Sequence, residues 1–211
     1  MTMHGARLTT ENLGKNYGDR PIIRACSFTL APGDTLGVTG RNGSGKSTLM
    51  KMLADVLTAS TGRVDYEVEG KRVDPAALAR HLGFIAPYLN LYTEFAAWEH
   101  VALVQKLRGL RFNPDAARTL FTLFGIDHRV DDRLESYSSG MQQRVKIICA
   151  ALHSPAFLLL DEPSTNLDAA GIEAVRALVA SRRERGQITV IATNDPDDLT
   201  LCTHVLDVGG T

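Results

Sequence analysis

The stretch Gly40-Arg41-Asn42-Gly43-Ser44-Gly45-Lys46-Ser47 decides the fold, because it fits the phosphate-binding pattern GxxxxGK[ST]. It follows residues 36–39, a short continuous apolar run that predicts a buried strand. It opens a segment, 47–57, whose apolar spacing predicts a helix. A strand, a glycine-rich turn and a helix in this order are the context that the pattern requires. The sequence therefore predicts a site for the phosphates of a nucleotide.

Each residue type in this loop has a physical role in holding phosphate. Glycines let backbone N–H groups converge on the phosphate oxygens, and the helix N-terminus adds its positive end. Lys46 reaches the outer phosphates as a point charge, and the Ser47 hydroxyl can ligate Mg²⁺. ATP and Mg²⁺ are therefore the expected cofactors. The residues of this loop expected to bind them are Gly40, Asn42, Gly43, Ser44, Gly45, Lys46, Ser47 and Thr48.

A second apolar run, 157–160, ends in two carboxylates, Asp161 and Glu162. At the carboxyl edge of a parallel sheet, these side chains would lie beside the phosphate loop. Asp161 is expected to hold Mg²⁺ through water, and Glu162 to polarise the attacking water. The alternative is a strand that ends at an ordinary polar turn.

The composition is that of an ordinary globular protein. The 211 residues include 23 Lys and Arg against 24 Asp and Glu, and 44% are hydrophobic. The charge balance argues against a nucleic-acid partner, and the apolar content excludes general disorder. No apolar run is long enough to span a bilayer, and no signal peptide is expected. Three scattered cysteines form no metal pattern and suit a reducing cytoplasm.

Strand-like and helical runs alternate, which predicts an α/β fold with a mostly parallel central sheet. Two segments with period-two alternation, 22–30 and 63–69, predict half-exposed antiparallel strands. Further central strands are expected at 189–192 and 205–208. Further helices are expected at 97–108, 114–124, 139–152 and 169–185.

Successive helices between about residues 94 and 155 break this rhythm and indicate a helical insertion. We therefore expect one domain over 1–211. Its nucleotide-binding core, with an antiparallel β part, covers 1–86 and 156–211, and its helical part covers 87–155.

Two further segments and one further residue carry a resemblance to a known family. Ser136-Tyr137-Ser138-Ser139-Gly140-Met141-Gln142-Gln143-Arg144 resembles the signature segment of ABC ATPases, and Ser164-Thr165-Asn166-Leu167-Asp168 resembles their D-loop. Tyr17 resembles the aromatic residue that stacks on adenine in that family. With the phosphate loop and the acidic strand end, the resemblance runs from about residue 8 to 207, and it implies a P-loop NTPase of the ABC type.

The resemblance implies a protein that works as a pair, with a second copy of itself or a paralogous ATPase subunit. In the family, two such domains face head to tail and trap two ATP molecules. Ser138, the backbone around Gly140, and Asp168 would then contact nucleotide held by the other chain. The alternative for Ser138 is a simple helix N-cap, and both roles can hold together.

Two positions depart from the family pattern. Pro87 stands where the family has a glutamine that senses Mg²⁺, and it has no side-chain donor or acceptor. Tyr88 or Asn90 would have to replace it. Asn194 stands where the family has a histidine that bonds the γ-phosphate. The expected catalytic residues are thus Glu162, Lys46 and Asn194, with slow hydrolysis; the alternative is that Asn194 supports ordinary turnover.

The leading hypothesis for function is the ATPase subunit of an ABC exporter, cytoplasmic and peripheral on the inner face of the cell membrane. The short chain resembles small bacterial exporter ATPases, including those of cytochrome c biogenesis. Apolar residues at the start of the insertion would meet a separate membrane permease, or they pack on the sheet: Tyr88, Leu91, Tyr92, Phe95 and Trp98. The alternatives are a soluble ABC ATPase serving cluster assembly and a nucleotide-gated, dimerising scaffold with very slow hydrolysis.

Overall fold

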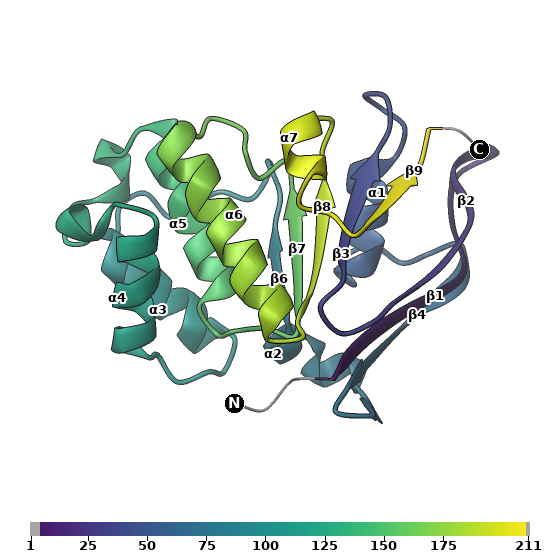
Figure 1. Ribbon diagram of the computed structural model, residues 1–211, viewed down its shortest axis with the longest axis horizontal. Coiled ribbons are helices and arrows are strands. Elements are labelled where there is room, and N and C mark those ends of the chain that lie inside the picture. The colour runs from purple at the N-terminus through teal and green to yellow at the C-terminus, as the bar shows by residue number, and fades with distance from the viewer. Residues whose placement is uncertain (1–4, 210–211) are drawn as a thin grey trace.

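The computed structural model describes residues 5–209, and it contains two sheets with helices around them (Figure 1). Residues 1–4, part of the segment expected to lack a signal peptide, and 210–211 lie outside the described residues. The five-stranded sheet is entirely parallel, in the order β6-β7-β8-β3-β9. Its strands are β3 (Thr35–Thr39), β6 (Leu82–Ile85), β7 (Phe157–Asp161), β8 (Ile188–Ala192) and β9 (His204–Asp207).

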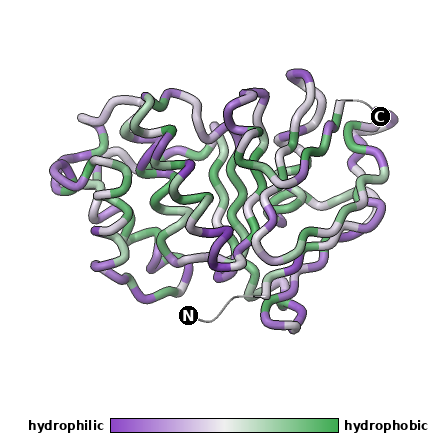
Figure 2. Tube along the Cα trace, in the orientation of Figure 1, coloured by the Kyte–Doolittle hydropathy of each residue, from purple (hydrophilic) through white to green (hydrophobic). Residues whose placement is uncertain are grey.

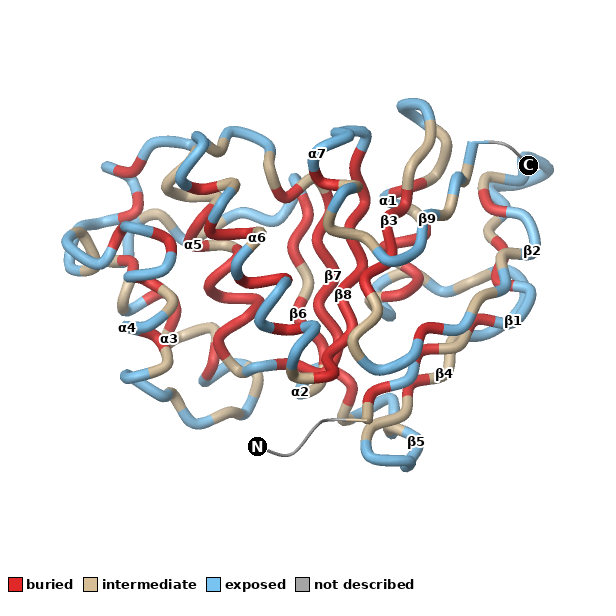
Figure 3. The backbone as a smooth tube through the Cα atoms, in the orientation of Figure 1, coloured by how far each residue is buried: buried red, intermediate tan, exposed pale blue. Residues whose placement is uncertain are grey.

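The central strands β7 and β8 are buried along their whole length, which explains their continuous apolar sequence (Figure 3). Alternate residues face opposite sides of the sheet. Leu158 and Leu160 join one core cluster, and Phe157 and Leu159 join the other. The apolar strands therefore run through the middle of the molecule with a core on each face (Figure 2).

The second sheet is antiparallel, in the order β2-β1-β4-β5. Its strands are β1 (Ala6–Tyr17), β2 (Arg20–Leu30), β4 (Thr61–Val68) and β5 (Lys71–Arg72). The two strands expected from alternation, β2 and β4, are confirmed as antiparallel members of this sheet. They do not pair with each other, because β1 lies between them.

Helices cover both faces of the parallel sheet (Figure 1). Helix α1 contributes to the core cluster that includes the antiparallel strands, whereas α3, α4, α5 and α6 contribute to the other cluster. The helices are α1 (Lys46–Leu53), α2 (Leu78–His81), α3 (Ala97–Leu107), α4 (Pro114–Leu123), α5 (Ser139–Ala151), α6 (Ala169–Glu184) and α7 (Pro196–Leu199), with 3-10 turns at Pro75–Ala77, Asp127–Arg129 and Leu134–Ser136.

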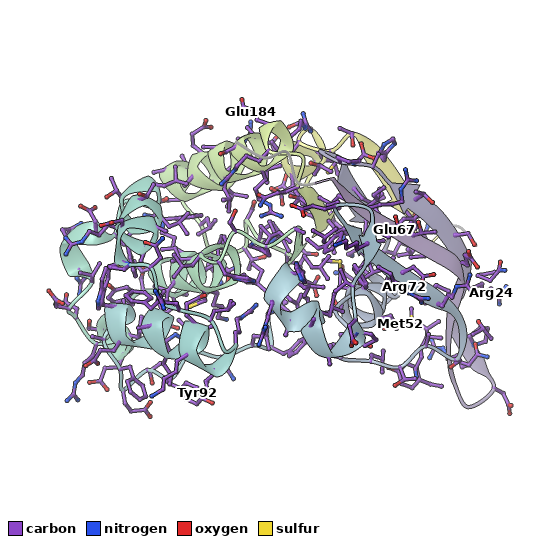
Figure 4. All side chains as sticks on the ribbon, turned by 90° about the horizontal axis from the view of Figure 1, so that it is seen from below. Arg24, Met52, Glu67, Arg72, Tyr92 and Glu184 are labelled. Atoms are coloured by element: carbon purple, nitrogen blue, oxygen red, sulfur yellow. The ribbon has the colours of Figure 1, made fainter. Side chains whose placement is uncertain are left out.

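The start of the helical part divides into packed and exposed residues. Trp98 packs on the core, and its ring centroid lies 6.0 Å from that of Phe121. Leu91 packs against the same core cluster. Tyr92 is 58% exposed and lies at the outer edge of the helical part (Figure 4), and Tyr88 and Phe95 are exposed as well. The two alternatives therefore divide among the five residues: Leu91 and Trp98 pack on the core, and Tyr88, Tyr92 and Phe95 are exposed.

Candidate functional site

The phosphate loop connects the end of β3 to the start of α1, as the sequence predicts. Gly45 directly precedes the helix with φ +108°, a left-handed conformation that favours glycine. A Cβ atom at Gly45 would lie 2.8 Å from the Ile23 side chain, so the position also has no room for one. The loop therefore depends on glycine to aim the free N–H groups of the first helical turn at a ligand.

Lys46 is buried, and its Nζ atom donates a hydrogen bond to the Gly40 carbonyl at 2.9 Å. This contact joins the two ends of the loop and holds the ammonium group inside it. The Ser44 hydroxyl is also buried, and it has no hydrogen-bond partner among the described residues. A buried cation, an unsatisfied hydroxyl and a helix N-terminus together form a site suited to an anion.

Asp161 ends β7 next to this loop, and only 1% of it is exposed. Neither of its carboxylate oxygens has a hydrogen-bond partner within the part of the chain that the structure describes. Burial raises the pKa of Asp161, and the nearby Ser47 hydroxyl and the charges of Lys46 and Lys51 oppose that rise. Buried carboxylate oxygens with free acceptor capacity, beside a serine hydroxyl, fit Mg²⁺, which prefers oxygen ligands.

Glu162 follows with φ 52°, a conformation that non-glycine residues adopt rarely and that is common at functional sites. Its N–H donates to the Ala192 carbonyl at 2.8 Å, which fixes the backbone. Burial raises the pKa of Glu162, the Lys46 charge lowers it, and neighbouring carboxylates, among them Asp161 and Asp198, raise it. A carboxylate whose pKa lies above the usual range is a better proton acceptor for general-base chemistry.

Lys46, Ser47 and Glu162 line one hollow of about 410 Å³, whereas Asp161 is not part of its lining. Tyr17, which is 54% exposed, stands at its edge, so its ring is open to a stacking ligand. Asn194 reaches the same site, because its Nδ2 donates to Asn42 Oδ1 at 3.1 Å. The residues that line the hollow are Tyr17, Ile22, Asn42, Gly43, Gly45, Lys46, Ser47, Thr48 and Glu162.

The remaining expected site residues lie at a different hollow, of about 560 Å³, that shares no lining residue with the first. Ser138, Gly140 and Asp168 line it. The Ser138 hydroxyl caps α5 by accepting from Met141 N at 3.3 Å, so the capping role is present. One chain therefore does not bring these three residues to its own phosphate loop.

Asp168 has a local structural role as well. Its carboxylate caps α6 by accepting from Gly171 N at 2.8 Å, and it is also paired with Arg144. These hydrogen bonds, the one from Gly171 first, lower the pKa of Asp168. The acid is thus held as an anion at the edge of the second hollow.

Residues 23–165 match the sequence profile of a family described as ABC transporter. The chain belongs to the ABC transporter family. It is 32% identical to the cytochrome c biogenesis ATP-binding export protein of Cupriavidus metallidurans, over 91% of each chain. It is also 32% identical to a lipoprotein-releasing system ATP-binding protein of Rhodospirillum rubrum, over 96% of this chain and 92% of that protein.

Solved structures of ABC proteins share the fold. An ATP-binding subunit of an ABC transporter superposes with a TM-score of 0.81 at 25% identity, covering 96% of this chain and 86% of that one. A putative ABC transporter ATP-binding protein from Pyrococcus furiosus gives a TM-score of 0.82 at 20% identity, covering 96% of this chain and 97% of that one. The expected ABC-type α/β fold is thereby confirmed. Between residues 5 and 209, no helix is long and apolar enough to cross a membrane.

Tyr88 and Asn90 are the two residues considered as replacements for the glutamine at the position of Pro87. The Lys51 Nζ atom is 4.3 Å from the centroid of the Tyr88 ring. Burial, and then the Asp161 charge, raise the pKa of Tyr88. Lys51 was missed by sequence reasoning, although it follows Ser47 by one helical turn and that spacing places the two on one face of α1. Asn90 is exposed.

Proposed function

We propose that this chain is the ATP-binding and ATP-hydrolysing subunit of an ABC exporter, and that it works as an ATP-bridged pair docked on a separate membrane permease. One observation carries the proposal: the phosphate loop and the signature segment line separate hollows with no residue in common. Each chain then offers two half-sites, and a second copy, or a paralogous subunit, completes both. Ser138, Gly140 and Asp168 would face the nucleotide held by the partner chain.

Within one half-site, each side chain has a distinct role. The loop N–H groups and Lys46 bind the phosphates, and Ser47 and Asp161 would hold Mg²⁺, which neutralises phosphate charge when bound. Glu162 orients the attacking water and accepts its proton. Asn194 donates its amide N–H toward the outer phosphate. Tyr17 offers its exposed ring to adenine.

An exporter role is supported by the relatives, which include a cytochrome c biogenesis export protein and a lipoprotein-releasing system protein. The permease would meet the exposed side chains Tyr88, Tyr92 and Phe95 at the start of the helical part, 87–155. Apolar groups on a surface favour association with a partner. In this arrangement the subunit is held at the inner face of the cell membrane through the permease alone.

The test of pairing uses Glu162→Gln, which keeps the size of the side chain and removes the proton acceptor. We expect this variant to bind ATP without hydrolysing it and to accumulate as a closed dimer in gel filtration with ATP and Mg²⁺. Lys46→Ala is the matched control, because it removes the phosphate-binding ammonium and should remain monomeric. A Glu162→Gln chain that binds ATP and elutes only as a monomer would contradict the pairing.

A second candidate function is a nucleotide-gated scaffold that dimerises but scarcely hydrolyses ATP. The observation in its favour is that Pro87 and Asn194 lack the side-chain groups that the family uses at those positions. Steady-state phosphate release distinguishes the two functions, because the scaffold would bind ATP and pair without turnover. A soluble ABC ATPase would hydrolyse ATP but would not co-purify with membranes that contain the permease.

A further inference from the structure

Asp198 is a buried carboxylate that raises the pKa of Glu162 but lines neither of the two hollows. It is 3% exposed and belongs to the short helix α7, shortly after Asn194. Its two oxygens accept hydrogen bonds from two different loops. Oδ1 accepts from the Ser164 hydroxyl at 2.5 Å, and Oδ2 accepts from the Thr193 hydroxyl at 3.0 Å. The Asp198 carboxylate therefore links two segments that are far apart in the sequence.

Each of the two loops carries a residue of the proposed reaction. Ser164 lies two residues after Glu162, and Thr193 directly precedes Asn194. The Thr193 N–H donates to the Val38 carbonyl at 3.0 Å, so this residue is also fixed to the end of β3. The bonds to Asp198 thus set where the Glu162 loop lies relative to the Asn194 loop.

The Ser164 loop continues into the second hollow. Asn166 and Asp168 line that hollow, together with the start of α5. The loop is packed closely on α5, because Gln143 Nε2 donates to the Pro163 carbonyl at 3.2 Å and a Cβ atom at Gly140 would lie 2.5 Å from the Asn166 carbonyl oxygen. A shift of Ser164 would therefore move residues that line both hollows.

We propose that Asp198 is a positioning residue that fixes Glu162 and Asn194 relative to each other and couples both to the loop 164–168, which would face a second copy of the chain. This inference rests on the proposed function. Removing either hydroxyl leaves a buried carboxylate oxygen unsatisfied, so the network favours one arrangement of the two loops. Asp198 itself need not touch nucleotide.

Ser164→Ala and Thr193→Val each remove one hydroxyl with little change in shape. We expect each variant to lower kcat for ATP hydrolysis about tenfold, because small misplacements of catalytic groups are costly. The Kd for ATP should stay within about twofold of wild type, since the phosphate loop is intact. The double variant should lose little more than either single variant, because both changes break the same link.

A second readout does not depend on turnover. In the Glu162→Gln background, Ser164→Ala should make the ATP-bound dimer dissociate about tenfold faster, because loop 164–168 would lie in the interface. Ser164→Thr and Thr193→Ser keep a hydroxyl and should recover most of the wild-type kcat. Asp197→Asn is the matched control, since Asp197 is an exposed neighbour on α7 and makes no contact with either loop hydroxyl in the described hydrogen bonds.

Three results would overturn the inference. These are a wild-type kcat in Ser164→Ala, losses in the two single variants that multiply in the double variant, and an unchanged dimer lifetime. Ser164 is on a half-exposed loop, so its truncation opens no cavity in the core. A wild-type protein that releases no phosphate would instead refute the proposed hydrolysis, and the dimer lifetime would still decide the role of Asp198.

Discussion

Asn194 is the residue with the most direct expected effect on the rate of ATP hydrolysis. Its amide is already engaged, because Nδ2 donates to Asn42 Oδ1 in the phosphate loop. An amide can donate a hydrogen bond to phosphate, but it carries no charge and moves no proton. The Nδ2 atom carries a second N–H group, and that group can donate to a phosphate while the bond to Asn42 is kept.

We expect Asn194→His to raise kcat for ATP hydrolysis. A charged or better polarised donor at the transition state is worth about 2–4 kcal/mol, or roughly 10² to 10³ in rate. Steady-state phosphate release from the wild type and the variant measures this change. Asn194→Ala is the matched control and should be slower than wild type. Equal turnover in the histidine variant would show that Asn194 does not limit the rate.

At this scale the sequence predicted the phosphate loop and the two carboxylates, because each is a local pattern on a strand end. It did not predict Lys51 beside Tyr88 or the link between Asp198 and Ser164. These partners come from segments that only the parallel sheet brings together. A single sequence contains no signal for which distant residues will pair, and Asp198 stands in the polar run 194–198, where nothing marks it as buried.

Helices and strands with a regular local pattern were predicted from the sequence, and those whose pattern is broken were not. The central strands were predicted from their apolar runs, and helices α3 to α6 from their apolar spacing. Strand β1 was missed because its pairing with β2 shifts register at several points, which breaks the alternation that would reveal a strand. Helix α1 ends at Leu53 instead of 57, shortly before Asp55, which adopts φ 56°.

Ser138 at the start of α5 allows the capping and nucleotide roles to be separated. We expect Ser138→Ala to lower the free energy of unfolding of the isolated chain by about 1 kcal/mol, because the N-cap is lost. If the residue also contacts nucleotide on a partner chain, the ATP-bound dimer formed in the Glu162→Gln background should weaken as well. Urea denaturation and gel filtration measure the two effects.

Ser139→Ala is the matched control for this change, since Ser139 is an exposed neighbour that does not cap the helix. It should leave the free energy of unfolding nearly unchanged. A Ser138→Ala variant with lower stability but an unweakened dimer would leave only the capping role. Stability equal to wild type would contradict the cap itself.

The junction between the helical part and the parallel sheet contributes to the response of the whole molecule to pH. His153 lies there, with Nε2 3.2 Å from Arg108 Nη1, and Arg108 donates to the Leu82 carbonyl at 2.7 Å. Burial, and then the Arg108 charge, lower the pKa of His153 to about 4. The unfolded chain therefore binds a proton at this residue at higher pH than the folded chain does.

Because the folded pKa is the lower one, stability is lost as the pH falls below about 6.5, the unfolded value. We expect His153 to contribute a loss of about 2 kcal/mol in the free energy of unfolding between pH 7.5 and 5. The variant His153→Gln should remove that part of the pH dependence in urea denaturation. His128→Gln, at an exposed histidine, is the control and should keep the wild-type dependence. Identical curves for His153→Gln and wild type would contradict the assignment.

The placement of two unlike half-sites on one chain has a consequence for stoichiometry. In the pairing that we propose, each copy uses both of its half-sites on the same neighbour, related by a two-fold axis. No unused half-site then remains to recruit a third chain, so growth ends at two and neither rings nor filaments form. Such an assembly is self-limiting, and its full complement of nucleotide is an even number.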